Sequence, residues 1–221
     1  MRGKLIVLDG LDGSGKSTQA QLLADRLLAE KRKVELLSYP DYSQPSSTLV
    51  KMYLNGAFSK SADGVNAYAA SSFYAVDRYA SYMQFWKEKL ENGFIMIASR
   101  YVSSNAIHQM VKLPKDEWDT FLDWLEDYEY QKLSLPRPDR VIFLDMSRAV
   151  ADQLILSRYH GDESKKDIHE QNMSYLEQCM ESAHYAAAKK GWQVIRCCDG
   201  EHPFPIEEIA QKIMLSVKEV I

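Results

Sequence analysis

The chain has 221 residues, of which 46% are hydrophobic, and this suits one α/β domain with a sizeable core. Its formal net charge of −4 argues against a broad nucleic-acid-binding surface, and no apolar run approaches the length of a membrane-spanning helix. The three cysteines follow no regular spacing, so we expect reduced thiols and a cytoplasmic protein. Because the chain enters an apolar segment at once, no signal peptide is expected.

Short apolar segments alternate with helical patterns along the chain. Strands are predicted at 4–8, 34–39, 94–99, 140–145 and 192–197. Helices are predicted at about 16–30, 64–91, 103–130, 147–158, 168–190 and 205–220. This alternation predicts one α/β domain over 1–221, with a parallel five-stranded sheet flanked by helices. Since ligands bind beyond the carboxyl ends of such strands, the segments 39–45, 99–109 and 145–148 are candidate site segments.

The segment after the first strand, Gly10-Leu11-Asp12-Gly13-Ser14-Gly15-Lys16-Ser17-Thr18, is a phosphate-binding motif. Its glycines let backbone N–H groups face phosphate oxygens, and Lys16 can reach the β and γ phosphates. The Ser17 hydroxyl is placed to ligate Mg²⁺, and the next helix directs its positive end at the anion. The motif predicts the P-loop NTPase fold and an ATP site made of Gly10, Asp12, Gly13, Ser14, Gly15, Lys16, Ser17 and Thr18.

A phosphate loop alone fits a GTPase, an ATPase or a kinase, but the guanine-reading Asn-Lys-x-Asp run is absent. Together with the loop, a series of later motifs resembles the thymidylate kinase family over nearly the whole chain. The motifs are Asp77-Arg78, Arg100-Tyr101 with Ser104-Asn105 and Gln109, Pro138-Asp139 before Ile142–Asp145, and Asp167–Glu170 before Tyr175-Leu176. The resemblance implies Mg²⁺-dependent transfer of the γ-phosphoryl group of ATP to dTMP, a nucleoside monophosphate kinase reaction in dTTP biosynthesis.

The resemblance also implies an acceptor site for dTMP. Arg78 and Arg100 suit bidentate contacts to its phosphate, and Tyr74, one helical turn before Arg78, stands where the family places an aromatic ring against thymine. Asp12 would contact the phosphate–sugar end of the acceptor or organise the metal and Lys16. The full predicted set is Asp12, Tyr39, Tyr42, Tyr74, Arg78, Arg100, Ser104, Asn105, His108 and Gln109, with Ser104 and Asn105 at the base edge and His108 near the sugar.

The polar stretch 159–167 is predicted to be a loop or lid, within a lid segment at about 158–170. Because the phosphate loop contains no arginine, the lid is expected to supply the remaining transition-state charge. Its candidates are Arg158, Lys165 and Lys166, which join Lys16, Arg100 and Asp12 as predicted catalytic residues, although Arg158 could instead stack on adenine.

Four positions depart from the family pattern. Ser99 replaces an Asp that would help to hold Mg²⁺ or orient Arg100, so Asp9 or Asp12 could provide the metal's second shell. Asp41-Tyr42 stand where the family often has an Arg, His108 replaces a Tyr, and Asp9 replaces the usual Glu. These departures predict a divergent member of the family, with a reduced rate or an altered acceptor preference.

Two alternatives remain at this stage. One is a kinase for another pyrimidine nucleotide or for a deoxynucleoside, with Asp41 as the general base. The other is a catalytically weakened regulatory nucleotide-binding protein, which Ser99 suggests. The family pairs as a homodimer, and the apolar faces of helices near 64–91 and 103–130 could form the interface.

Overall fold

The computed structural model describes residues 2–59, 61, 64–158 and 173–221. At its centre lies a five-stranded, fully parallel sheet in the order β2-β3-β1-β4-β5. The strands are β1 (Lys4–Asp9), β2 (Val34–Ser38), β3 (Ile95–Ser99), β4 (Arg140–Asp145) and β5 (Gln193–Arg196). In the central register, Ile6 lies opposite Ile97 on β3 and opposite Arg140 on β4. The predicted fold and each predicted strand are confirmed, with no bound shifted by more than one residue.

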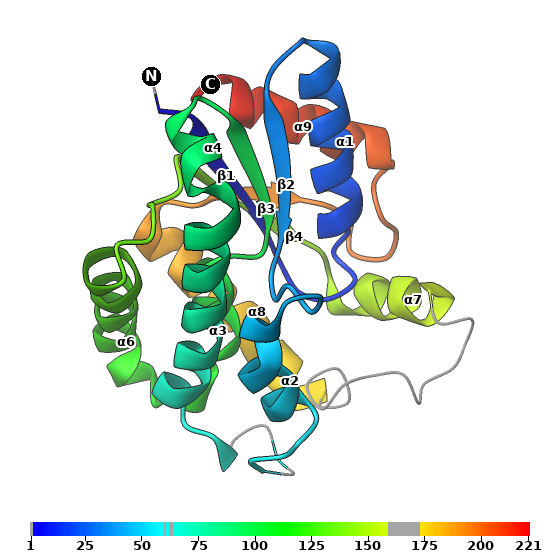
Figure 1. Cartoon of the computed structure of the whole chain (residues 1–221). Coiled ribbons are helices and arrows are strands. Elements are labelled where there is room, and N and C mark those ends of the chain that lie inside the picture. Colours follow the sequence, from blue (N-terminus) through cyan, green and yellow to red (C-terminus); the bar gives the residue numbers. More distant parts are fainter. Residues whose placement is uncertain (1, 60, 62–63, 159–172) are drawn as a thin grey trace.

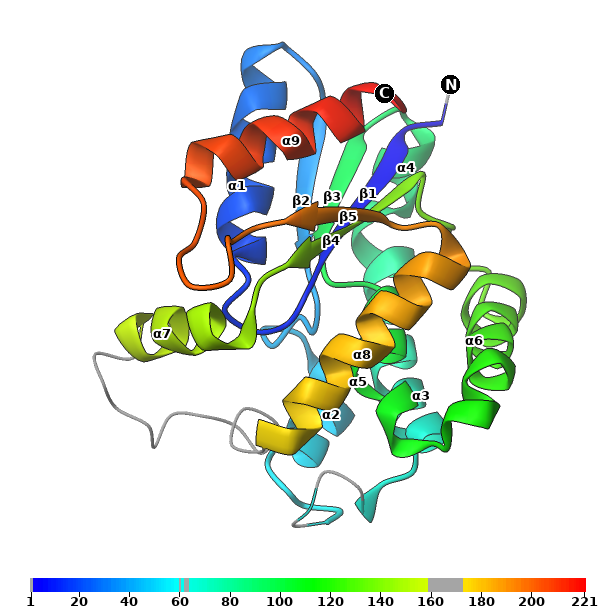
Figure 2. The same ribbon diagram turned by 180° about the vertical axis from the view of Figure 1, so that it is seen from behind.

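Helices cover both faces of the sheet (Figures 1 and 2). They are α1 (Lys16–Ala29), α2 (Thr48–Leu54), α3 (Ala67–Ser81), α4 (Lys87–Glu91), α5 (Ser103–His108), α6 (Trp118–Glu126), α7 (Arg148–Arg158), α8 (Met173–Lys190) and α9 (Ile206–Lys218). Alternate strand residues point to opposite faces. Ile6 and Leu8 therefore pack against α1 and α9, whereas Leu5 and Val7 face the core beneath α5 and α6.

The prediction of one continuous helix over 103–130 is wrong. The segment divides into α5, two 3₁₀ turns and α6, and then continues as a π-helical turn at Asp127–Lys132. Pro114 accounts for the break, because proline disfavours helical geometry at the residue before it, and Leu113 is extended with φ −107° and ψ 151°. The predicted helix over 64–91 also begins later and contains a π-helical turn, Tyr82–Trp86, between α3 and α4. The short α2 was not predicted.

The direction of the connections reverses at the central strand β1: from β1 the chain crosses to β2 at one edge of the sheet, whereas from β3 it crosses to β4 and then to β5 at the other edge. Ligands bind at such a switch point, beyond the carboxyl ends of the strands. The phosphate-binding loop follows β1 at this edge and α5 follows β3, so both enter the same region (Figure 2). Among the described residues, no helix is long and apolar enough to cross a membrane.

Candidate active site

A cleft of about 350 Å³ opens at the carboxyl edge of the sheet. All ten residues predicted to bind the acceptor line it, together with Gly13, Gly15, Lys16, Ser17 and Thr18 of the phosphate-binding loop. Ser99 lines it as well, and Ser38, Pro40 and Leu54 are further lining residues that the sequence did not single out. Of the predicted ATP-site residues, Gly10 and Ser14 are not among those that line it, and Ser14 is buried. The other predicted donor residues and the acceptor residues face one shared space.

The phosphate-binding loop wraps around the side chain of Lys16. Lys16 is buried, and its Nζ donates hydrogen bonds to the carbonyl oxygens of Gly10 (2.9 Å) and Leu11 (2.7 Å). Gly15, in the left-handed region with φ +84°, immediately precedes the first residue of α1. The amides of the first helical turn have no intrahelical acceptor, so this end of α1 favours an anion.

Gly13 brings the same loop against α7. A Cβ atom at position 13 would lie 2.5 Å from the carbonyl oxygen of Ala151, too close for any side chain unless α7 shifts. The backbone of α7 therefore packs directly on the loop. An arginine at this point of the loop has no room here.

Asp9 joins the loop to the start of α5. The Asp9 carboxylate is fully buried and accepts hydrogen bonds from the Gly10 amide (2.9 Å), from Ser103 Oγ (2.6 Å) and from Ser104 Oγ (2.8 and 3.0 Å). Because these donors surround the carboxylate, it is poorly placed to serve as the metal's second shell. The Ser104 proton is likewise used by Asp9, so toward a nucleotide base Ser104 can only accept a hydrogen bond.

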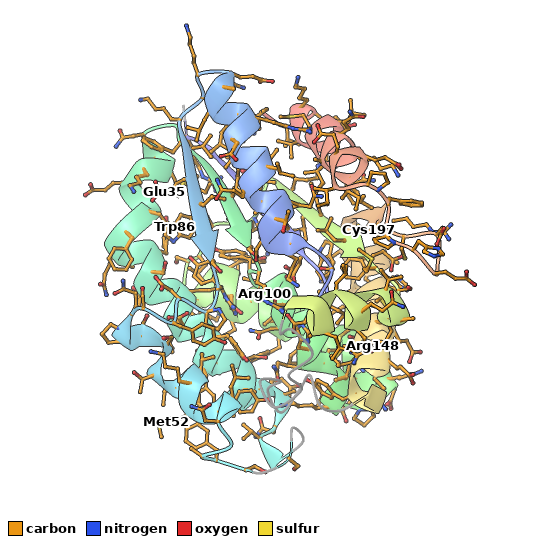
Figure 3. All side chains as sticks on the ribbon, turned by 90° about the vertical axis from the view of Figure 1, so that its right-hand side faces the viewer. Glu35, Met52, Trp86, Arg100, Arg148 and Cys197 are labelled. Carbon is orange, nitrogen blue, oxygen red and sulfur yellow. The ribbon has the colours of Figure 1, made fainter. Side chains whose placement is uncertain are left out.

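Arg100 lies near the centre of the molecule, beyond the strand ends (Figure 3). Its backbone is in the left-handed region with φ +69°, which is uncommon for a residue other than glycine. One guanidinium nitrogen donates to Asp12 Oδ1 (2.5 Å) and another to His108 Nε2 (3.0 Å). Since arginine can only donate, the His108 Nε2 atom is the acceptor. Arg100 thereby connects the phosphate-binding loop with α5.

The charges at this junction reinforce one another. Burial by itself raises the pKa of Asp12, but Arg100 and Lys16 outweigh burial and hold that pKa well below its usual range. Burial lowers the pKa of Arg100, whereas the Asp12 carboxylate raises it above the ordinary value. Both groups are therefore charged at neutral pH. An incoming phosphate would compete with Asp12 for the guanidinium.

The most deeply buried ion pair was not predicted from the sequence. Arg78 on α3 donates from Nε to Glu129 Oε2 (2.7 Å) and from Nη2 to Glu129 Oε1 (2.5 Å), and both side chains are at most 1% exposed. Asn105 Nδ2 donates to the same carboxylate (3.1 Å). The expected bidentate phosphate contact of Arg78 is not supported, because Glu129 occupies that edge. The sequence offered no signal for Glu129, which stands among several acidic residues at the end of a helix.

The three predicted tyrosines differ in their surroundings. Tyr39 is buried, and its hydroxyl donates to Ser81 Oγ (3.2 Å) and accepts from Trp86 Nε1 (2.9 Å), while burial raises its pKa to about 12. Tyr74 is partly buried at the edge of the Tyr53 ring, with the ring centres 6.3 Å apart. Tyr42 is 52% exposed. Tyr74 combines a ring supported by Tyr53 with partial exposure in the cleft, as stacking on a base requires.

Asp41, the predicted base of a deoxynucleoside kinase, is not among the described residues that line the cleft. Its Oδ1 accepts hydrogen bonds from the amide (3.1 Å) and hydroxyl (2.6 Å) of Ser43, which closes a local turn. Asp77, beside Arg78 in sequence, accepts from the Asp41 amide (3.2 Å) and from Ser46 Oγ (2.6 Å). Asp77 thus holds the loop after β2 by hydrogen bonds, whereas its neighbour Arg78 lines the cleft.

Oxygen ligands suited to Mg²⁺ are present in the cleft. The Ser17 hydroxyl and the ionised Asp12 carboxylate both line it, and hard oxygen donors with water are the usual Mg²⁺ environment. The described residues contain no group of three or more His, Cys, Asp or Glu side chains that could hold a metal by themselves. The donor set therefore fits an ion that also binds nucleotide phosphates.

The predicted lid residues fall largely outside the described residues. Lys165 and Lys166 lie between 158 and 173, and Arg158 is placed only as the last residue of α7. Their expected contribution to the site thus stays a prediction.

Comparison with known proteins identifies the family. The thymidylate kinase family model matches residues 8–213. Thymidylate kinase of Schizosaccharomyces pombe is 34% identical over 150 residues, which are 68% of this chain and 64% of the relative. The human enzyme is 33% identical over 151 residues, which again are 68% of this chain and 64% of the relative. Thymidylate kinase of Mycobacterium tuberculosis strain H37Rv is 27% identical over 190 residues, 85% of this chain and 87% of the relative.

The fold comparison agrees. The structure of thymidylate kinase from Candida albicans superposes with a TM-score of 0.69 at 21% identity, covering 99% of this chain and 92% of that one. The matches to the fission-yeast and human relatives span just under two thirds of their lengths. Because the family model covers nearly the whole sequence, the chain belongs to the thymidylate kinase family.

Proposed function

We infer that this protein transfers the γ-phosphoryl group of ATP to dTMP, giving dTDP and ADP. The observation that carries this inference is the position of Arg100. Its guanidinium contacts Asp12 of the phosphate-binding loop and His108 of α5, so it lies between the donor and acceptor ends of one cleft. Phosphoryl transfer depends mainly on positioning and charge neutralisation, and a bridging arginine provides both.

The donor end is built from the loop and the start of α1. We propose that the loop amides and Lys16 hold the β and γ phosphates, with Lys16 exchanging its carbonyl partners for phosphate oxygens. Ser17, with Asp12 nearby, would hold Mg²⁺, which neutralises phosphate charge when bound. Burial of Lys16 strengthens its attraction for an anion, because water screens the charge less.

We assign the contacts with dTMP from the hydrogen-bonding groups that each side chain has not already used within the protein. Arg100 takes the acceptor phosphate, since its guanidinium is partly accessible in the cleft. Tyr74 stacks on the base, whereas Arg78, Asn105 and Gln109 face its polar edge. Gln109 supports this assignment because its buried Oε1 atom has no hydrogen-bond partner among the described residues, and a buried acceptor of that kind calls for a donor.

The remaining transition-state charge is proposed to come from the lid, through Arg158, Lys165 or Lys166. The packing of Gly13 against Ala151 supports this division of roles, because it leaves no space for a cationic side chain at that point of the loop. Ala151 lies on the first turn of α7, so α7 begins beside the proposed donor site.

Neither alternative activity is favoured. A deoxynucleoside kinase needs a base near a neutral hydroxyl, and Asp41 instead closes a turn outside the cleft. A regulatory protein without catalysis is suggested only by Ser99, whereas Lys16, Ser17 and Arg100 are all in place.

We further propose that the protein forms a homodimer through α3 and the π-helical turn after it. Val76, Tyr79, Met83 and Phe85 are large apolar side chains that are each 40–47% exposed on this segment. The other predicted interface is less suitable, because the apolar side of α6 is buried in the core. Sedimentation equilibrium of the wild type and of Met83→Lys tests the proposal: a dimer that the substitution weakens supports it, and a monomeric wild type refutes it.

Three buried free cysteines support a cytoplasmic location.

A substrate panel tests the proposed activity. Purified protein with ATP and Mg²⁺ is offered dTMP, dUMP, dCMP, UMP and thymidine, and ADP release is followed. Turnover of dTMP well above the others supports the inference. Preference for thymidine would establish the nucleoside kinase, and ATP binding without turnover of any acceptor would establish the regulatory protein.

A further inference from the structure

Glu129 lies behind the acceptor end of the cleft, on the π-helical turn that extends α6. Its carboxylate is fully buried and is contacted by two cleft-lining residues from different helices, Arg78 of α3 and Asn105 of α5. A buried carboxylate is costly unless it is paired and hydrogen-bonded, and Glu129 satisfies both requirements. It therefore holds two potential ligand-binding groups in fixed positions relative to each other.

The orientation of the Asn105 amide follows from its partners. Nδ2 donates to the backbone carbonyl of Ser71 (3.2 Å) and to Glu129 Oε1 (3.1 Å). Both partners are pure acceptors, so a flipped amide would place its oxygen against two other oxygens. Within the described part of the chain, these contacts use only the nitrogen of the amide. The Oδ1 atom, a hydrogen-bond acceptor, remains for the cleft.

The same carboxylate determines what Arg78 presents. Nε and Nη2 are directed at Glu129, so Nη1 is the nitrogen left for the cleft, and it can only donate. The Glu129 charge also compensates the Arg78 charge within a fully buried pair. Arg78 therefore presents a fixed donor more than a net positive charge.

The acceptor end thus offers a donor from Arg78 and an acceptor from Asn105, beside the Oε1 acceptor of Gln109. The imide edge of thymine or uracil is complementary, because it carries the O4 acceptor beside the N3–H donor. The corresponding edge of cytosine is reversed, with an N4 amino donor beside the N3 acceptor. A site with fixed polarity rejects the reversed pattern, since it would leave buried polar groups without partners.

We propose that Glu129 is a specificity-determining residue of this kinase, because it fixes the orientation of the Arg78 guanidinium and of the Asn105 amide and so selects thymine over cytosine. Glu129 acts through these two residues and is a positioning residue. The proposal rests on the proposed phosphorylation of dTMP and assigns the origin of its base preference.

The test is Glu129→Gln, which keeps the shape and replaces one acceptor oxygen by a donor group. A rotated Gln can donate toward Asn105, which removes one of the two acceptors that hold the amide in place and leaves only the Ser71 carbonyl. We expect the ratio of kcat/KM for dTMP to that for dCMP to fall at least about ten-fold. The KM for dTMP should rise, while the KM for ATP stays within about two-fold. Because the ratio is measured on a single preparation, partial unfolding leaves it unchanged.

Glu126→Gln is the matched control, since Glu126 lies one turn earlier and contacts Arg137 and Lys190 at the surface. It should leave the ratio unchanged. An unchanged ratio in Glu129→Gln, or equal rises in the KM values for ATP and dTMP, would overturn the proposal.

If Glu129→Gln does not fold, the affinities of the wild-type protein for dTMP and for N3-methyl-dTMP are compared instead. We expect methylation to weaken binding at least about ten-fold, because it removes the donor that Asn105 accepts; equal binding would overturn the proposal. Failure of the wild type to phosphorylate dTMP would instead refute the proposed activity, so the two failures are distinguishable.

Discussion

Replacing Asp9 with Ala tests how the phosphate-binding loop is attached to α5. The carboxylate accepts hydrogen bonds from the Gly10 amide, Ser103 Oγ and Ser104 Oγ, all at 2.6–3.0 Å, and is itself inaccessible to water. Removing it leaves three donors without their acceptor. The two hydroxyls can rotate toward other acceptors, but the Gly10 amide is fixed by the backbone of the loop.

The expected loss of stability follows from these contacts. A buried donor without a partner costs about 1–3 kcal/mol, so the amide together with partial losses at the two hydroxyls gives about 3 kcal/mol. For a chain of this size, 1 kcal/mol changes Tm by about 2–4 °C, and Asp9→Ala should therefore lower Tm by about 6–12 °C.

Differential scanning calorimetry measures this change, with Asp25→Ala on the exposed side of α1 as a control that should change Tm little. A double-mutant cycle then isolates the contact. Ser104→Ala should be clearly less costly in the Asp9→Ala background than in the wild type, with a coupling of about 1 kcal/mol. A Tm change below about 2 °C, or equal costs of Ser104→Ala in both backgrounds, would refute the assigned role of Asp9.

Four further outcomes are expected. Lys16→Ala should lower kcat by roughly a hundred-fold or more, and near-normal turnover would contradict the donor-site assignment. Ser99→Asp should raise kcat if a carboxylate beside the cleft is the missing metal ligand, whereas an unchanged kcat would show that the metal is anchored elsewhere. Because the pKa of Asp12 is depressed, its stabilising effect is present above its ordinary pKa near 3.8 and is lost as pH falls below it. The difference in urea midpoint between wild type and Asp12→Asn should accordingly shrink below pH 4, and a constant difference would argue against the ion pair. Burial raises the pKa of Cys179 and of Cys197 to about 12, so neither thiol should react with a disulfide reagent at pH 8 until the protein unfolds.

The loop Gly10–Thr18 and the five strands could be predicted because their signals are local. A short apolar run before a glycine-rich turn specifies a strand, and the order of Gly, Lys and Ser specifies what the turn binds. The break of the expected helix at Pro114 was also a local signal, but helical periodicity on both sides masked it. The ten acceptor residues share one cleft because their segments follow the carboxyl ends of parallel strands or come from α3.

The partners of these residues could not be predicted in the same way. Glu129 meets Arg78 across 51 positions of sequence, and Asp9 meets Ser104 across 95. No spacing rule reaches that far, since only the packing of α3, α5 and the end of α6 brings the groups together. The expected phosphate contact of Arg78 was revised for this reason.

By itself, the sequence determined the fold, the phosphate-binding loop and the family, because each is encoded in short-range pattern and residue type. The tertiary structure decided which atoms of those residues remain available for a ligand. Arg78, Asn105, Ser104 and Tyr39 each use part of their hydrogen-bonding capacity on buried partners distant in sequence. Burial makes those pairings obligatory, so what remains for a nucleotide is fixed by packing and not by residue type alone.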